Sequence, residues 1–144
     1  MKTAPLITLL QSTESISSLL TQTVTGPHPR PAAVYKQVLP RGYKLPAIVV
    51  HRYNGTHDQD MSGPIDIRED NFQLDIYGDT QDDCDAVTDA SRDFLTGFTG
   101  TLPDDTVVTG TYLEQDRDMP FLPNADVKSL AFRAMLGFRF VSKV

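Results

Sequence analysis

Cysteine is almost absent from this 144-residue sequence, and tryptophan is missing altogether. A single cysteine cannot form an intrachain disulfide, so the fold has to be held together by its apolar core. Cys84 falls on the apolar side of a predicted helix. We therefore expect a buried core thiol and not a nucleophile, because reactive thiols need a partly exposed, electropositive setting.

Long apolar runs are also missing, so no segment has the length of a membrane-spanning helix. The first residues lack the basic region, apolar block and small-residue cleavage site of a signal peptide, which predicts synthesis in the cytoplasm. With 40% hydrophobic and 22% charged residues, the composition predicts one soluble domain over residues 1–144. A chain of this length buries about two-thirds of its unfolded surface.

Catalytic signatures are absent as well: there is no GxGxxG, P-loop, nucleophile elbow, HExxH or Cys/His zinc spacing. Four residues that could bind metal occur close together, but their spacing matches no known mechanism: His51, His57, Asp58 and Asp60. We therefore predict no metal site, no cofactor and no enzymatic activity.

Charge is distributed unevenly along the chain. The net charge is −6, and it divides into +5 for residues 1–53, −15 for residues 54–126 and +4 for residues 127–144. Such segregation can give one subunit a basic and an acidic surface, which suits head-to-tail association into a closed ring. The overall negative charge argues against tight, sequence-specific binding of nucleic acid.

The clearest local pattern lies between residues 65 and 98. Residues 72–77 alternate between apolar and polar, which is the period of a half-buried strand. Ile65 and Ile67 alternate in the opposite phase, so we expect a β-bulge or a bend between residues 68 and 71.

The helical period takes over after Gly78 and Asp79. Six side chains fall within one sector and form the predicted buried stripe: Cys84, Val87, Ser91, Phe94, Leu95 and Phe98. Four carboxylates fall on the opposite side: Asp82, Asp85, Asp89 and Asp93. Thr80 or Asp79 is the expected N-terminal cap, and Gly97 with Gly100 is the expected stop.

The first part of the chain is less regular. Residues 5–20 have the spacing of an amphipathic helix, with Pro5 in its first turn and Thr3 as its cap. Residues 24–46 are rich in proline and predict an extended arm, with one short strand at 33–38.

The remaining segments alternate between strands and polar loops. Residues 47–53 predict a strand whose apolar start is covered on both faces, followed by a polar loop up to Gly63. Residues 106–113 predict a shorter strand and 114–126 a second polar loop. Residues 130–140 alternate without error and predict the strongest strand.

These elements predict an α+β fold. Its sheet is mostly antiparallel with four to five strands, and two helices pack on one face. The order along the chain is helix, arm with a short strand, strand, strand, helix, strand, strand.

Two segments are candidate interfaces. The proline-rich arm is one, and an apolar island inside the second polar loop is the other, since it either folds back on the core or meets a partner. The candidate contact residues are Pro29, Pro31, Tyr35, Met119, Phe121 and Leu122.

The assembled pattern resembles the small tail-completion proteins of long-tailed phages, the lambda-type tail terminators. The resemblance covers most of the chain. It is carried by the Leu- and Ser-rich first helix, LPAIVV at 45–50, FQLDIYG at 72–78, the helix from Ala86-Val87 to Phe94-Leu95, YLE at 112–114 with the acidic loop after it, and AFRAMLGFRF at 131–140.

The resemblance implies a structural role without catalytic residues. Members of this family form a hexameric ring at the head-proximal end of the tail tube, stop tube polymerisation and receive the head connector. The implied partners are other copies of the chain, the tail tube protein and the head connector or neck protein, in the virion and with no membrane. DNA passes through such a ring without specific binding, and the carboxylates of Asp82, Asp85, Asp89 and Asp93 would repel it if they line the channel.

Three alternatives remain open from the sequence. The chain could be another phage neck or baseplate component with a similar core. It could be a small-molecule-binding α+β domain, or a hydrolase that uses His51 and nearby acids.

Overall fold

The computed structural model contains three helices and six strands among the residues that it describes. These residues are 1–20, 33–38, 45–60, 63–119 and 132–143, with the backbone alone described at 57–60, 63–65 and 119. The elements are α1 (Thr3–Ser12), α2 (Glu14–Ser17), β1 (Val34–Lys36), β2 (Ala47–Asp60), β3 (Gly63–Gly78), α3 (Gln81–Leu95), β4 (Gly100–Thr101), β5 (Val107–Met119) and β6 (Phe132–Lys143).

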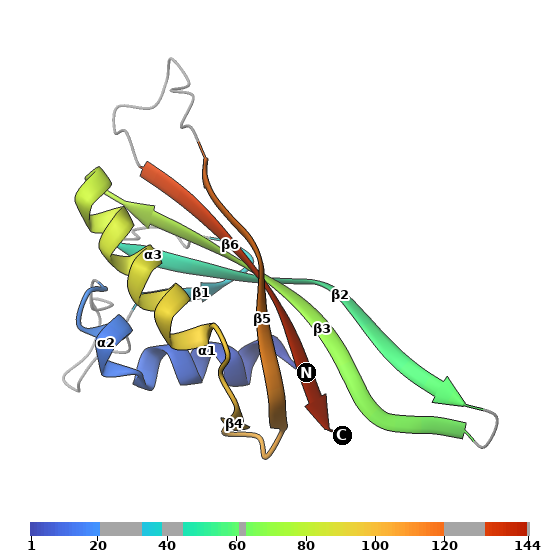
Figure 1. Ribbon diagram of the computed structural model, residues 1–144. Coiled ribbons are helices and arrows are strands. Elements are labelled where there is room, and N and C mark those ends of the chain that lie inside the picture. The colour runs from blue at the N-terminus through green and yellow to red at the C-terminus, as the bar shows by residue number, and fades with distance from the viewer. Residues whose placement is uncertain (21–32, 39–44, 61–62, 120–131, 144) are drawn as a thin grey trace.

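The six strands form one twisted sheet in the order β1-β2-β3-β6-β5-β4 (Figure 1). β1 pairs in parallel with β2, and every other pair is antiparallel. α1 packs against β1 and β2, while α3 packs against β3, β6 and β5 on the same face. The expected α+β class is therefore confirmed, although the sheet has six strands instead of four to five.

The core fills the space between the sheet and the helices. Phe72 on β3 meets Phe140 on β6 edge to face, with ring centroids 5.4 Å apart. The other fully buried large side chains of these layers include Leu6, Leu10, Ile16, Ile48, Leu74, Ile76, Leu95, Leu136 and Phe138. Alternation of apolar residues along β3 and β6 thus covers the helix side of the sheet, as the period-two pattern predicts.

Helix α3 matches its prediction closely. The Thr80 hydroxyl accepts a hydrogen bond of 3.1 Å from the Asp83 amide, so Thr80 is the cap. Gly97, with a φ of +73°, follows the helix in the left-handed conformation that glycine adopts readily. Cys84 is fully buried, as expected, and burial raises the pKa of its thiol.

The predicted first helix is interrupted. It begins at Thr3 and stops at Ser12, and a separate single turn covers Glu14–Ser17. Thr13 separates the two, in an extended conformation, and its hydroxyl bonds the Leu9 carbonyl at 2.8 Å. Thr3 is not the cap, because the helix has already started at that residue and Lys2 precedes it without a side-chain cap.

Both predicted polar loops are wrong in part, because strand pairing continues through them. β2 and β3 stay paired as far as Asp60 with Gly63, and β5 continues to Met119. The ladder is made of backbone hydrogen bonds, which polar side chains do not prevent when they face solvent. Of the second loop, residues 120–126 lie outside the described part of the chain.

The predicted bulge in β3 is also wrong. β3 pairs with β6 without interruption from Ile67–Lys143 to Gly78–Phe132. The Ile67 side chain is 40% exposed and lies on the face of the sheet away from the helices. The alternation of side chains along β3 therefore continues through Ile67 without a slip of one residue. The register shift lies on the neighbouring strand, between Arg52 and Asn54 of β2.

Apolar residues at the start of β2 are buried on both faces, as expected: Ala47, Ile48, Val49 and Val50.

None of the helices in the described ranges is both long and apolar enough to span a membrane.

Gly78 permits the close approach of β3 and α3. A Cβ atom at Gly78 would lie 2.8 Å from the backbone nitrogen of Cys84, which cannot move independently of the helix. We expect Gly78→Ala to lower the free energy of unfolding by about 1–3 kcal/mol, measured by urea denaturation. Gly110→Ala is the control, because the atoms nearest to its Cβ would belong to the Tyr112 side chain, at 3.1 Å, and not to a backbone. Equal losses in the two variants would contradict this explanation.

Candidate functional site

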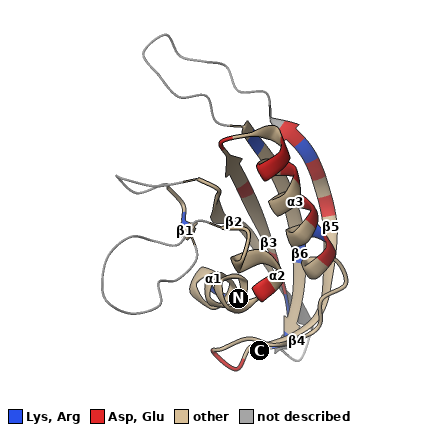
Figure 2. Cartoon of the chain, turned by 90° about the vertical axis from the view of Figure 1, so that its left-hand side faces the viewer, with Lys and Arg blue, Asp and Glu red and all other residues tan. Residues whose placement is uncertain are grey.

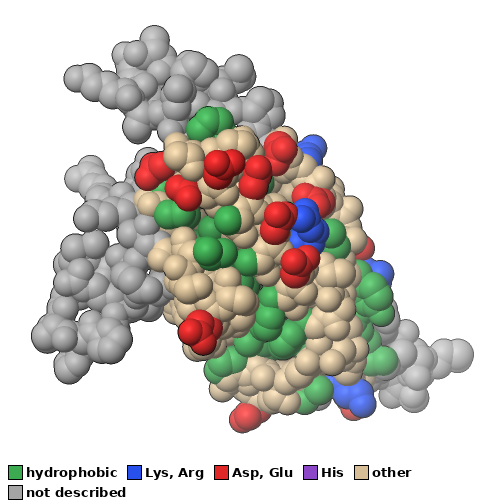
Figure 3. All heavy atoms as spheres, turned by 60° about the vertical axis from the view of Figure 1, so that its left-hand side comes forward, with side chains coloured by type: hydrophobic (Ala, Val, Ile, Leu, Met, Phe, Trp, Pro, Cys, Tyr) green, Lys and Arg blue, Asp and Glu red, His purple; other side chains and the backbone are tan. Residues whose placement is uncertain are grey.

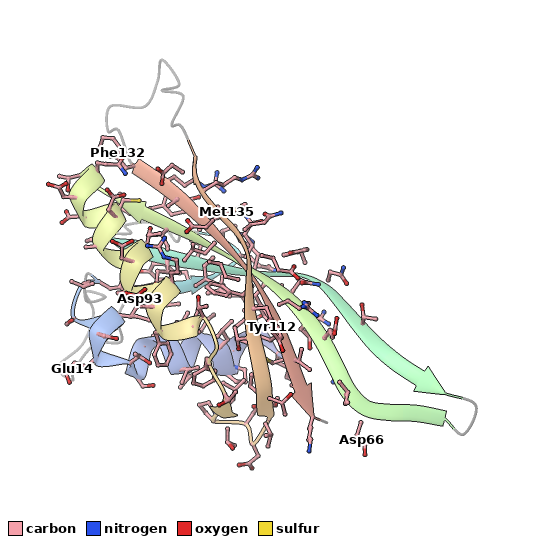
Figure 4. The ribbon with its side chains drawn as sticks, viewed as in Figure 1. Glu14, Asp66, Asp93, Tyr112, Phe132 and Met135 are labelled. Atoms are coloured by element: carbon pink, nitrogen blue, oxygen red, sulfur yellow. The ribbon has the colours of Figure 1, made fainter. Side chains whose placement is uncertain are left out.

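The acidic face of α3 is exposed along its length. We use this name for Asp82, Asp85, Asp89 and Asp93, and all four side chains are exposed, as predicted. Figure 3 shows carboxylates gathered over this helix, and Figure 4 labels Asp93 on it. The neighbouring strand β5 adds Asp116, which extends the negative surface toward the edge of the sheet (Figure 2).

One arginine bridges the acidic face to β5. Arg92 donates a hydrogen bond of 2.6 Å to Asp116 and a second one to Asp89. The bond to Asp116 is the main reason why the pKa of Arg92 is raised, so this side chain stays positively charged. Asp85 accepts a hydrogen bond of 2.7 Å from Gln81, a neutral partner.

A second charged surface lies beside the start of α1. An open hollow there is lined by the first residues of the chain and by four basic side chains: Lys2, Lys36, Arg52 and Arg68. We call these four residues the basic hollow. No acidic side chain is part of the described lining. An adjoining hollow shares Lys2 and Arg68 but also includes Asp104 and Asp105.

Asp70 is buried next to the basic hollow and pairs with two groups that line it. Its side chain is 1% exposed, and it accepts hydrogen bonds from Arg52 at 2.8 and 2.6 Å and from the α-amino group of Met1 at 2.8 Å. A buried carboxylate needs such partners, since isolated burial of its charge is very costly. The Asp70 network therefore fixes both the start of α1 and the guanidinium of Arg52.

The face of the sheet away from the helices carries a separate network. Asp75 is 3% exposed and accepts hydrogen bonds from Arg133 at 2.9 Å and from Gln73 at 2.9 Å, with His51 Nε2 3.1 Å away. Arg133 also lies over the ring of Tyr77. Nearby, Arg139 pairs with Glu69 and Glu114 and stacks on Tyr112. Figure 4 labels Met135 and Tyr112 on β6 and β5.

The surroundings of Asp75 are relevant to the alternative in which the protein is a hydrolase that uses His51. Asp75 lies beside His51, but its carboxylate already binds the Arg133 guanidinium and the Gln73 amide. Such an arrangement is typical of a structural ion pair. Within the described ranges, no group of three or more His, Cys, Asp or Glu side chains could hold a metal ion. The side chains of His57, Asp58 and Asp60 are not described, so the absence of metal there stays a prediction.

The candidate interface residues are only partly placed. Tyr35 lies in β1 with a half-buried side chain, and burial raises the pKa of its phenol. Met119 is the last residue of β5. Four candidates lie outside the described residues: Pro29, Pro31, Phe121 and Leu122.

Sequence reasoning missed both the basic hollow and Asp70. One signal was present: Asp70 continues the even-numbered phase of Phe72 and Leu74, which places a carboxylate on the core side of β3. A buried acid in that position requires a cation. Nothing in the pattern identified Lys2, Lys36 and Arg52 as its surroundings, because they come from three separate elements.

These features define an α+β fold, a curled sheet covered on one face by helices, with an acidic and a basic surface. The chain belongs to the tail completion protein gp17 family, whose model matches residues 4–141. It is therefore a structural protein of the phage virion tail, which confirms the resemblance to tail-completion proteins.

Solved structures agree on the fold. One of 15 matching chains comes from a structure described as the virion of a native gene transfer agent particle. The TM-score is 0.60 at 19% identity, and the match covers 78% of this chain and 79% of that chain. No curated protein sequence matches.

The Asp75 network can be tested against the exposed Arg92–Asp116 pair. We expect Asp75→Asn to lower the free energy of unfolding by about 1–3 kcal/mol, because the Arg133 guanidinium loses its buried anion. Asp116 is 38% exposed, so Asp116→Asn should cost about 0–1 kcal/mol. Urea denaturation measures both, and similar values would contradict the structural role of Asp75.

Proposed function

We propose that this protein forms a closed ring at the head-proximal end of the tail tube. There it ends polymerisation of the tube and provides the surface that the head connector binds. The observation that carries the proposal is the family match over residues 4–141, which includes nearly all of the fold and places the chain among tail completion proteins. Features of the sheet support the ring.

The sheet has an open strand edge on each side. Within the described ranges, β1 pairs with β2 only as far as Val50, so the outer edge of β2 is open from His51 onward. On the other side, the Thr111 carbonyl accepts a hydrogen bond from the Gly97 amide, and beyond Thr111 no described residue pairs with the outer edge of β5. Open edges pair readily with other strands. Two unlike edges on one subunit suit head-to-tail contacts that repeat until a ring closes.

The β2–β3 hairpin projects beyond the rest of the sheet (Figure 1). β6 pairs with β3 only from Ile67 onward, so residues 58–60 and 63–66 form a two-stranded ribbon in the described structure. An isolated two-stranded ribbon is marginally stable in water. It gains stability by packing on another surface, and an adjacent subunit or the tube offers one.

Charge supports a passive relation to DNA. The chain carries a net charge of −6. A negatively charged ring repels phosphates, so DNA would pass through it without specific binding.

Electron microscopy of tails assembled without this protein tests the proposed function. We expect overlong tails without heads, because nothing ends the polymerisation of the tube or joins it to the connector. Supplying the wild-type protein from a plasmid should restore the length and the attached heads. Tails of normal length joined to heads in its absence would refute the proposal.

A further inference from the structure

We propose that the basic hollow of one subunit receives the acidic face of α3 from the next subunit. The contact rests on the proposed ring and specifies how neighbouring copies recognise each other. The occupant of the hollow is thus a second copy of this chain, and recognition is electrostatic.

The hollow is suited to a negatively charged partner. Its four basic side chains come from four places in the chain, the residue before α1, β1, β2 and β3: Lys2, Lys36, Arg52 and Arg68. The side chains of Lys2 and Lys36 are exposed, so their ammonium groups can extend toward a partner. Arg52 is held in place by its two hydrogen bonds to Asp70, so part of the surface is already ordered before the partner arrives.

The acidic face offers the complementary charge. Its four carboxylates are exposed along one side of a 15-residue helix, and Arg92 is the one basic residue of that helix. Arg92 is engaged with Asp89 and Asp116, which leaves Asp82, Asp85 and Asp93 without a cationic partner among the ion pairs of the described residues. Repulsion among like charges on one helix is relieved when a basic surface covers them.

The two surfaces are placed for a head-to-tail contact and not for a symmetric one. α3 begins just after Gly78, at one end of the β3–β6 ladder, and the Gly97 amide that follows the helix donates to the Thr111 carbonyl, at the level of Asp70. The acidic face therefore runs along the ladder. It is separated from the basic hollow across the sheet, since α1 lies over β1 and β2 while α3 lies over β3, β6 and β5. Unlike surfaces at different places on one subunit join copies in a chain that can close into a ring.

DNA is the main competing occupant of the hollow. A patch of four basic side chains on a chain of net charge −6 provides few phosphate contacts, whereas an acidic face of the same extent is present on every copy. Self-association is therefore the stronger inference.

Charge reversal of each surface provides the test. The hollow variant carries Lys2→Glu and Lys36→Glu, and the helix variant carries Asp85→Lys and Asp93→Lys. All four positions are exposed, so folding should be retained, which circular dichroism checks. Two control variants are also exposed. Arg117→Glu has the same change of charge as Lys36→Glu alone, and Glu14→Lys the same as Asp85→Lys alone, so these single variants are measured beside them.

Native mass spectrometry and binding to purified tail tubes measure ring formation. We expect each reversed variant alone to associate at least about tenfold more weakly than the wild type, because like charges now face each other. An equimolar mixture of the hollow and helix variants should recover association in an alternating ring. A variant with all four changes should also recover it, and both controls should behave as the wild type.

The remaining outcomes separate the contact from the ring. If the wild type forms rings and each reversed variant forms them equally well, the proposed contact is refuted and the proposed function still stands. Rings that form normally but retain DNA in the helix variant would place the acidic face in the channel instead. Loss of DNA binding without loss of association in the hollow variant would make DNA the occupant. A wild type that forms no ring, alone or on tubes, would refute the proposed function itself.

Discussion

The pairing of β3 with β6 is the constraint on which the rest of the molecule depends. Twelve consecutive residue pairs, from Ile67–Lys143 to Gly78–Phe132, keep one register without a bulge. That register sets Phe72 beside Phe138 and Leu74 beside Leu136, so the apolar side chains of both strands share one face. A slip of one residue would turn the whole set toward solvent. This register gives the sheet one continuous apolar face. The helices cover that face.

The position of α3 follows from the same ladder. β3 ends at Gly78, where the absence of a side chain lets the first turns of α3 approach the strand closely enough for Cys84 to be buried against the sheet. The apolar stripe of α3 then lies on β3, β6 and β5, and the opposite stripe of carboxylates is left in solvent. The acidic face is therefore a consequence of how the helix must be oriented to fill the core.

The sequence predicted those features that depend on periodicity. The alternation in residues 72–77 and 130–140 and the helical stripe around Cys84 identified β3, β6 and α3, because core burial imposes a period on each. The projecting hairpin and the second half of β5 escaped prediction. Their pairing rests on backbone hydrogen bonds between polar residues, which leave no periodic signal. The basic hollow escaped because Lys2, Lys36, Arg52 and Arg68 are brought together only by the tertiary fold.

Charge separation connects this architecture with the role of the protein in the tail. The proposed ring requires surfaces that recognise their neighbours in one direction. The described structure provides open strand edges on two sides, a projecting ribbon and two surfaces of opposite charge. Together these give each subunit unlike faces, which is the requirement for a closed ring.

Cryo-electron microscopy of the junction between head and tail tests the central claim most directly. The account predicts one closed ring of this protein between the tube and the connector, with each copy in contact with two others through unlike surfaces. Isolated copies, a symmetric dimer, or a location away from the head-proximal end of the tube would contradict it.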